Sequence, residues 1–140
     1  MAGRLARRLR EALVLDVRRP EARALTLLAV EEVVANILEH GYDGETGRPI
    51  EVGVLIREPE VFEVTIKDRA RLIDITRIQS GNLKKLARER AERGRGLALV
   101  HLLTRTMNHL ERVGGGNVIV LEFDAEHLSE IAREHSRDAA

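Results

Sequence analysis

The sequence predicts an α+β fold, a two-layer α/β sandwich with helices on one face of a mixed, mostly antiparallel sheet. Three observations support this prediction. Segments that alternate between apolar and polar residues occur in two adjacent pairs, which is typical of β-hairpins. Helical patterns precede, separate and follow these pairs. The chain of 140 residues is long enough for one core and shows no internal repeat, so we expect a single domain over residues 1–140.

Two helices are expected at the start of the chain. Residues 4–15 carry apolar side chains at a helical spacing with arginines between them, so we expect an amphipathic helix within residues 1–19. Pro20 suits the first turn of a second helix. That helix is expected to run to about His40 and to end at Gly41, because glycine commonly terminates helices.

A hairpin is expected next. Residues 43–47 have the composition of a turn, and residues 50–56 and 61–67 both alternate between apolar and polar side chains. Residues 58–60 lie between these two strands and contain a proline, which favours a turn. We therefore expect antiparallel pairing of the two segments.

The second half is expected to contain a helix, another hairpin and a closing helix. These elements are predicted over residues 94–107, 108–113, 117–123 and 125–135. Three consecutive glycines at 114–116 suit the turn of the hairpin, and Asp124 suits the N-cap of the last helix. Residues 69–93 lack a clear period and become highly charged, which indicates a long irregular segment.

The composition limits the classes of partner. Lys and Arg together number 23, as do Asp and Glu, so the net charge is zero. Nucleic-acid and membrane-surface partners favour a basic excess, and we expect neither. The chain has no cysteine, which excludes thiolate chemistry. No apolar run approaches the ~18 residues of a membrane span, and no leader is expected, so we expect a cytoplasmic protein.

The second predicted helix carries a regular row of polar side chains. Glu32, Asn36 and His40 are spaced four residues apart, so they share one face of a helix otherwise rich in core residues. Such side chains are favourable where they meet a ligand. Asparagine and glutamate oxygens suit Mg²⁺, and Glu32 could instead take a proton from a hydroxyl nucleophile. The spacing alone leaves a solvated helix face open.

Two further segments are candidates for the same site. Asp68 ends a predicted buried strand, where a carboxylate can accept a hydrogen bond from an amine such as that of adenine, although many aspartates simply close strands. Gly94 and Gly96 open the third predicted helix, where free backbone amides and the helix dipole attract anions. Arg93 and Arg95 add charge for phosphates. A flexible helix start is the alternative, since this glycine pattern is weak by itself.

In this order the three segments resemble the GHKL ATP-binding superfamily, and most of all its anti-sigma-factor serine kinase branch. The first motif of that branch reads Glu-x-x-x-Asn-x-x-x-His-Gly/Ala-Tyr, and the matching residues are Glu32, Asn36, His40, Gly41 and Tyr42. Asp68, Ile73 and Asp74 match its first glycine box, and Gly94, Gly96 and Leu97 match its second. The resemblance covers about residues 20–124.

The resemblance implies a Bergerat ATP-binding fold with ATP or ADP and Mg²⁺ as ligands. Asn36 would hold Mg²⁺, Asp68 would bind the adenine amine, and Glu32 would be the catalytic base toward a Ser or Thr hydroxyl. Residues 69–93 would form the ATP lid. The residues implied to contact nucleotide are Asn36, Asp68, Ala70, Ile73, Arg93, Gly94, Arg95, Gly96 and Leu97.

The resemblance also implies partners and an activity. In this branch the kinase phosphorylates a STAS-domain antagonist, sequesters a sigma factor and is usually a homodimer. The histidine-kinase branch is disfavoured, because the sequence shows no phospho-acceptor helix pair and its first motif differs from the form found in that branch. The competing function is a nucleotide-sensing, partner-binding module with little phosphotransfer.

Two departures from the family pattern bear on these alternatives. Ala70 stands where the first glycine box has glycine, and its extra methyl group favours the binding module. The strand that usually precedes the first helix is missing, because residues 1–15 have a helical pattern. The sheet is therefore expected to be one strand shorter than is usual.

Overall fold

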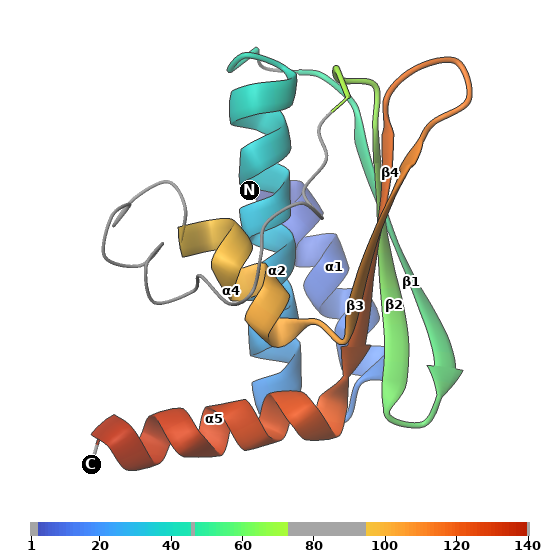
Figure 1. The fold of residues 1–140 in the computed structure, drawn as a ribbon. Helices are drawn as coiled ribbons and strands as arrows, with labels where there is room; N and C mark the ends of the chain where they lie inside the picture. The colour runs from blue at the N-terminus through green and yellow to red at the C-terminus, as the bar shows by residue number, and fades with distance from the viewer. Residues whose placement is uncertain (1–2, 46, 73–94, 140) are drawn as a thin grey trace.

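The computed structural model describes residues 3–45, 47–72 and 95–139. Its helices are α1 (Gly3–Asp16), α2 (Pro20–Asn36), the π-helical turn η1 (Ile37–Gly41), α4 (Arg95–Leu103) and α5 (Ala125–Ala139). Its strands are β1 (Ile50–Glu58), β2 (Val61–Asp68), β3 (Thr106–Glu111) and β4 (Asn117–Asp124). The strand order is β1-β2-β4-β3, and every neighbouring pair is antiparallel. The helices lie on one side of this sheet (Figure 1), which confirms the predicted α+β sandwich.

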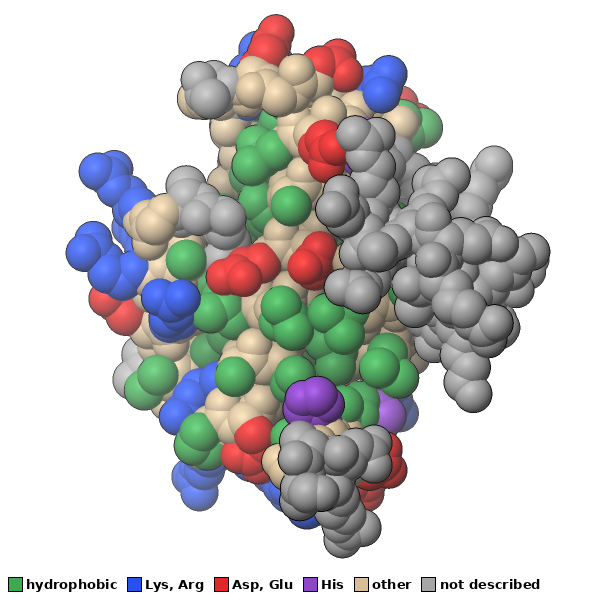
Figure 2. Space-filling view, turned by 90° about the vertical axis from the view of Figure 1, so that its left-hand side faces the viewer, with side chains coloured by type: hydrophobic (Ala, Val, Ile, Leu, Met, Phe, Trp, Pro, Cys, Tyr) green, Lys and Arg blue, Asp and Glu red, His purple; other side chains and the backbone are tan. Residues whose placement is uncertain are grey.

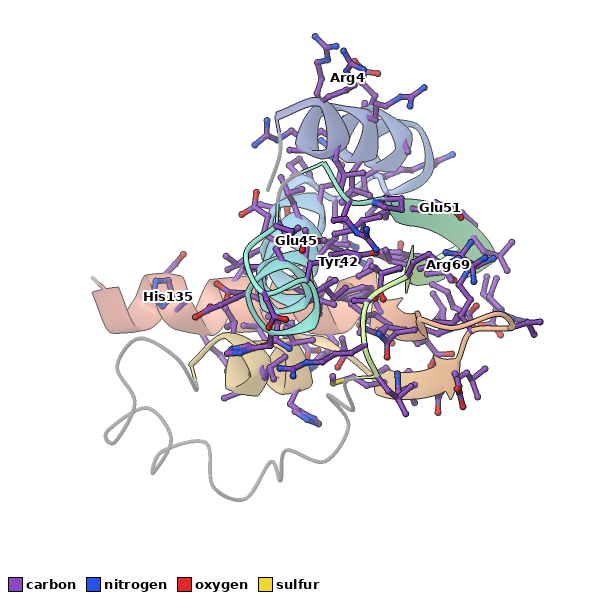
Figure 3. The ribbon with its side chains drawn as sticks, turned by 90° about the horizontal axis from the view of Figure 1, so that it is seen from above. Arg4, Tyr42, Glu45, Glu51, Arg69 and His135 are labelled. Carbon is purple, nitrogen blue, oxygen red and sulfur yellow. The ribbon has the colours of Figure 1, made fainter. Side chains whose placement is uncertain are left out.

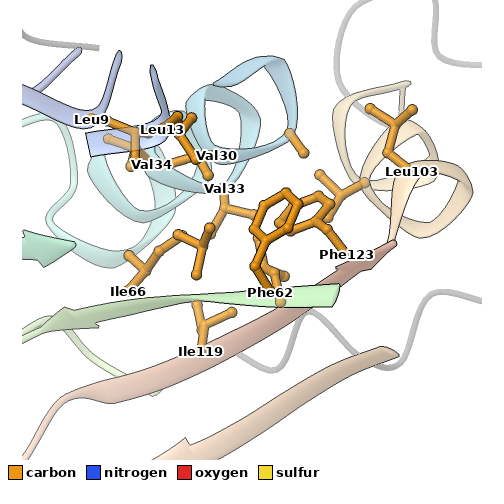
Figure 4. Close-up of a cluster of buried hydrophobic side chains, with 14 of the residues drawn as sticks. Leu9, Leu13, Val30, Val33, Val34, Phe62, Ile66, Leu103, Ile119 and Phe123 are labelled. Carbon is orange, nitrogen blue, oxygen red and sulfur yellow. The ribbon is translucent and has the colours of Figure 1, made fainter. Parts of the chain in front are cut away.

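The core lies between the sheet and α2. Phe62 of β2 and Phe123 of β4 are cross-strand partners whose rings stack with centroids 5.4 Å apart. Val30 and Val33 of α2 pack above them and are fully buried (Figure 4). Because α1, α4 and α5 also contact α2, apolar residues occur around most of its circumference. This central position holds α2 rigidly against the sheet.

Two local contacts fix the start of α2 and of α5. Asp124 Oδ1 accepts a hydrogen bond from the backbone N–H of Glu126 at 3.0 Å, so the predicted N-cap of α5 is confirmed. The buried Ser129 hydroxyl of α5 donates to Glu21 Oε1 at 2.7 Å. This hydrogen bond is the main cause that lowers the pKa of the Glu21 carboxyl, and it joins the first turn of α2 to α5.

The helical backbone of the second helix continues through η1 and ends at Gly41, as predicted, but the expected cause is not observed. Gly41 has no left-handed backbone; that conformation is adopted by Asp43, with a φ of 51°. The backbone N–H of Tyr42 bonds Ile37 O at 2.9 Å in a π-type turn, and that of Gly44 bonds Leu38 O at 2.8 Å. The bond from Gly44 to Leu38 closes the turn around Asp43, so the carbonyls of Ile37 and Leu38 both have backbone donors beyond the helix. The chain therefore leaves the helix without a left-handed glycine at position 41.

The helix predicted over residues 94–107 is too long. α4 ends at Leu103, and β3 begins at Thr106, two residues before the predicted strand. The Thr104 hydroxyl donates to Val100 O at 2.8 Å, which satisfies a carbonyl of the last helical turn. The next residue, Arg105, already donates its backbone N–H to Glu122 O at 2.7 Å. From Arg105 onward the backbone therefore forms hydrogen bonds with β4 in place of helical ones.

Candidate nucleotide-binding site

The start of α4 lies directly against the polar face of α2. A Cβ atom added to Gly96 would overlap the Glu32 carboxylate and lie 3.1 Å from its Cδ. The absence of a side chain at Gly96 therefore gives the Glu32 carboxylate its space. The structure thus brings together two residues that are 64 positions apart and that belong to different predicted motifs.

Glu32 and Asn36 are free to meet a ligand. Both side chains are half-buried, and neither makes a hydrogen bond or ion pair with a described residue. They lie four residues apart within regular α2, so they share a face. Figure 2, which looks onto the helical layer, shows acidic side chains surrounded by hydrophobic ones. Because both side chains are accessible and uncommitted to any described residue, a ligand could bind them without breaking a described contact.

Asp68 ends β2 with its carboxylate fully buried. Its Oδ1 accepts hydrogen bonds from the Ala70 backbone N–H at 2.8 Å and from the Asn117 side-chain amide at 2.9 Å. Its Oδ2 is buried and has no partner among the described residues. A buried acceptor of this kind matches a ligand that supplies an N–H donor, such as the exocyclic amine of adenine.

Asn117 completes the surroundings of Asp68, and the sequence analysis did not single it out. Its amide donates to Asp68 Oδ1 and to Arg71 O, both at 2.9 Å. Its Oδ1 lies 2.7 Å from His109 Nε2, which donates in the corresponding tautomer. Asn117 therefore holds the Asp68 carboxylate in one orientation. Its signal in the sequence is a polar residue at an inward-facing position of an otherwise apolar strand.

Hydrogen bonds join the segment after Asp68 to the end of the second helix. The Tyr42 hydroxyl accepts a hydrogen bond from the Arg69 backbone N–H at 2.6 Å and donates to Pro49 O at 2.8 Å. The Arg71 guanidinium donates to His40 O at 2.7 Å. Figure 3 shows Tyr42 between the loop after the helix and Arg69. The exposed His40 thus acts through its backbone at the helix end, and no ligand role is visible for its side chain.

Of the other residues predicted to contact nucleotide, some lie within the described part of the chain and some outside it. Ala70 is buried against the core, and its backbone conformation does not require glycine. Leu97 is half-buried and packs on the core, and Arg95 begins α4. The predicted residues that fall outside the described part of the chain are Ile73, Asp74, Arg93 and Gly94, together with positions 73–93 of the predicted lid.

The glycine turn of the second hairpin packs against the backbone of Asp68. Gly116 has a φ of 110°, and a Cβ there would overlap Asp68 O and lie 2.9 Å from Arg69 Cα. We expect Gly116→Ala to lower the free energy of unfolding by about 3 kcal/mol, because both strain and a backbone clash oppose it. Gly115 has a φ of 101° but open space, so Gly115→Ala should cost only about 1 kcal/mol. Urea denaturation checks the difference, and equal losses would contradict the close contact.

The contact between Gly96 and Glu32 yields a second prediction. We expect Gly96→Ala to displace the Glu32 carboxylate while lowering the free energy of unfolding by less than about 1 kcal/mol, because the clash involves the end of a flexible side chain. Phosphotransfer should fall about 10-fold or more if Glu32 is catalytic. Gly53→Ala is the control, since a Cβ at Gly53 meets nothing. Unchanged phosphotransfer in Gly96→Ala would contradict this placement of Glu32.

Three features come together here: a buried strand-end acceptor and two polar side chains on one helix, none with a partner among the described residues, and a glycine at the next helix start. This combination suits a sandwich domain that binds a nucleotide. Residues 3–123 match the model of the histidine kinase-like ATPase domain family. The chain therefore belongs to this GHKL-type family, and nucleotide binding follows from membership. No curated protein matches the chain.

Two similar solved structures come from the blue-light activated histidine kinase EL346 of Erythrobacter litoralis. Its histidine kinase domain gives a TM-score of 0.53 at 21% identity, over 80% of this chain and 49% of that one. A second structure of this kinase gives 0.51 at 20% identity, over 75% and 31%. The chain thus spans about half of the first and a third of the second. At these identities the likeness establishes the fold alone.

Membrane and metal features complete the description of the site. None of the helices in the described part of the chain has the length and apolar character needed to cross a membrane. The same residues contain no cluster of three or more His, Cys, Asp or Glu side chains suited to a metal ion.

Proposed function

We propose that the protein is an ATP-dependent serine/threonine kinase that acts as an anti-sigma-type switch on a STAS-domain antagonist. The observation that carries this proposal is the half-buried Glu32 carboxylate, which has no partner among the described residues and lies against Gly96. A domain that only binds nucleotide has no need of a free carboxylate at this position. A kinase needs one to accept the proton of the attacking hydroxyl.

In this proposal different described residues bind different parts of the nucleotide. Asp68 Oδ2 accepts a hydrogen bond from the adenine amine, and the start of α4 directs its backbone N–H groups at the phosphates. Asn36 is the residue whose amide oxygen would hold Mg²⁺, an ion that would neutralise phosphate charge. Tyr42 and Asn117 position Asp68 without touching the nucleotide.

Glu32 performs the proton transfer. As the hydroxyl oxygen of the substrate Ser or Thr bonds to the γ-phosphorus, Glu32 takes the hydroxyl proton, and the bond from phosphorus to the bridging oxygen breaks. The products are a phosphorylated partner and ADP.

The role of Asn36 can be tested separately from catalysis. We expect Asn36→Ala to remove the Mg²⁺ dependence of ATP binding, so that affinity falls to the value found in EDTA. Glu39→Ala, an exposed change in the following turn, should leave that dependence intact. Isothermal titration calorimetry with and without Mg²⁺ checks both variants. If ATP affinity in Asn36→Ala still depended on Mg²⁺ as strongly as in the native protein, Asn36 would not be the Mg²⁺ ligand.

Ala70 bears on the alternative function, a nucleotide-sensing module with little phosphotransfer. Its side chain is only 6% exposed, and its backbone N–H supports Asp68. Ala is therefore accommodated next to Asp68 without a left-handed backbone. This arrangement supports ATP binding in both functions, so only measurement of phosphotransfer separates them.

The direct test combines the protein with labelled ATP and each STAS-domain protein from the same genome. Transfer of the label to a Ser or Thr of one of them is expected, in the cytoplasmic setting that we propose for this switch. ATP binding without transfer to any of them would favour the sensing module. Sedimentation of the protein alone and with sigma factors tests the proposed homodimer and sigma-factor partner.

A further inference from the structure

A second cavity lies on the other side of the second helix from the nucleotide site. It has a volume of about 510 Å³ and is bounded by the first turns of α1, the end of α2, η1 and the loop that leads into β1. Val34 and Leu38 form its inner wall, whereas Asn36 faces α4 with Glu32. Because positions two apart on a helix point to opposite sides, the cavity is separate from the nucleotide site.

The floor of this cavity is apolar. Leu5 of α1, Val34 and Leu38 of the second helix and Ile50 of β1 contribute aliphatic side chains. Val34 is only 1% exposed, so the floor continues directly into the core. A cavity of this size and lining matches a small molecule with an apolar body, for which pockets of roughly 300–1,000 Å³ are typical.

The rim of the cavity is mainly basic. Arg4, Arg8, Arg48 and Glu45 line it, and Arg48 Nε forms an ion pair with Glu45 Oε2 at 3.9 Å, which leaves Arg4 and Arg8 as the uncompensated charges. Neither Arg4 nor Arg8 makes a hydrogen bond or ion pair with any residue that the structure describes. Figure 2 shows basic side chains gathered over α1, and Figure 3 shows Arg4 and Glu45 at this end of the molecule. The rim therefore carries an excess of positive charge that an anion would balance.

The wall of the cavity is held in place before any ligand arrives. The backbone N–H of Gly44 bonds Leu38 O at 2.8 Å, and the Tyr42 hydroxyl bonds Pro49 O at 2.8 Å. The Arg48 guanidinium lies 5.2 Å from the centroid of the Tyr42 ring. These contacts fix Tyr42, Gly44 and Arg48 relative to the end of the helix, so ordering these residues on binding would cost little free energy.

We propose that this cavity binds a small amphipathic anion, with its apolar body on the aliphatic floor and its carboxylate, sulfonate or phosphate at the arginines. The arginines provide donors that fit planar or tetrahedral anions, and the floor provides apolar area. The proposal is independent of the kinase function, because it uses none of the residues assigned to the nucleotide.

Fluorescence of 8-anilinonaphthalene-1-sulfonate, an amphipathic sulfonate, tests this site. Native protein should bind one equivalent with increased emission, and decanoate should displace it far better than uncharged decanol. Arg8→Glu should weaken probe binding about 10-fold or more, since it reverses a charge at the rim. Arg7→Glu is the matched control, because Arg7 is exposed on the same helix and does not line the cavity.

Two results would overturn the proposal. One is equal probe affinity in Arg8→Glu and Arg7→Glu, with both variants melting at the native temperature. The other is displacement by decanol as effective as displacement by decanoate, which would show that charge plays no part. Weaker binding in Arg8→Glu alone, together with selective displacement by decanoate, supports it.

Discussion

Asp68→Asn is expected to weaken ATP binding about 100-fold while leaving the fold intact. The substitution keeps the atom equivalent to Oδ1, which accepts hydrogen bonds from Ala70 and Asn117. It replaces the partnerless Oδ2 by an amide that donates, so two donors would face each other at the adenine amine. A lost hydrogen bond to a charged group is worth about 1.5–3 kcal/mol, and the opposed donors add to this.

The stability of Asp68→Asn separates a ligand-binding role from a structural one. The orphaned oxygen stabilises nothing in the described structure, so the free energy of unfolding should be unchanged or higher. Calorimetric titration gives the affinity, and urea denaturation gives the stability. Asp43→Asn, at an exposed position, is the control for both. Unchanged ATP affinity together with lower stability would make Asp68 a purely structural residue.

Glu32→Gln is expected to reduce phosphotransfer about 100-fold or more, with ATP affinity unchanged. The amide keeps the shape of the side chain beside Gly96 but cannot accept the hydroxyl proton. Binding should persist because, in the proposed site, other groups hold the nucleotide, namely Asp68, Asn36 and the start of α4. The measurement is the single-turnover rate of label transfer from saturating ATP to the STAS-domain substrate.

Glu31→Gln is the matched control for Glu32→Gln. Glu31 is the adjacent residue on the same helix, and its side chain is half-buried, as that of Glu32 is. It points about 100° away from Glu32 around the helix axis. Its substitution should leave the transfer rate within about 2-fold of the native value, since surface changes have small effects. Equal rates for native protein, Glu31→Gln and Glu32→Gln would remove Glu32 from the catalytic machinery.

Much of the fold could be predicted because the patterns that carry it are local. β2 and β4 alternate strictly between buried and partly exposed residues, so their period identifies them as strands. The junction after Leu103 could not be placed, because residues 104–106 (Thr-Arg-Thr) include neither glycine nor proline to mark a helix end. The strand begins only where β4 offers a partner. The π-type turn at Ile37–Gly41 likewise depends on a cap formed by later residues.

The candidate site could be predicted where the type of a single side chain is enough to suggest its role. Glu32, Asn36, Asp68 and Gly96 have side chains, or the lack of one, that suit their roles in any setting. Asn117 was missed because its role depends on the pairing register of β2 and β4, which brings it beside Asp68. The hydrophobic pattern determines which face of β4 is buried, but a shift of the pairing by two residues would bury the same face. The strand's own sequence therefore does not show that Asn117 lies beside Asp68.

Calorimetric titration of the native protein with ATP and with GTP, both in excess Mg²⁺, tests the central claim most directly. The account predicts one ATP site, with GTP bound about 10-fold or more weakly, because guanine places a carbonyl oxygen where Asp68 Oδ2 requires a donor. Equal affinity for the two nucleotides, or no heat with ATP, would contradict an adenine site built around Asp68.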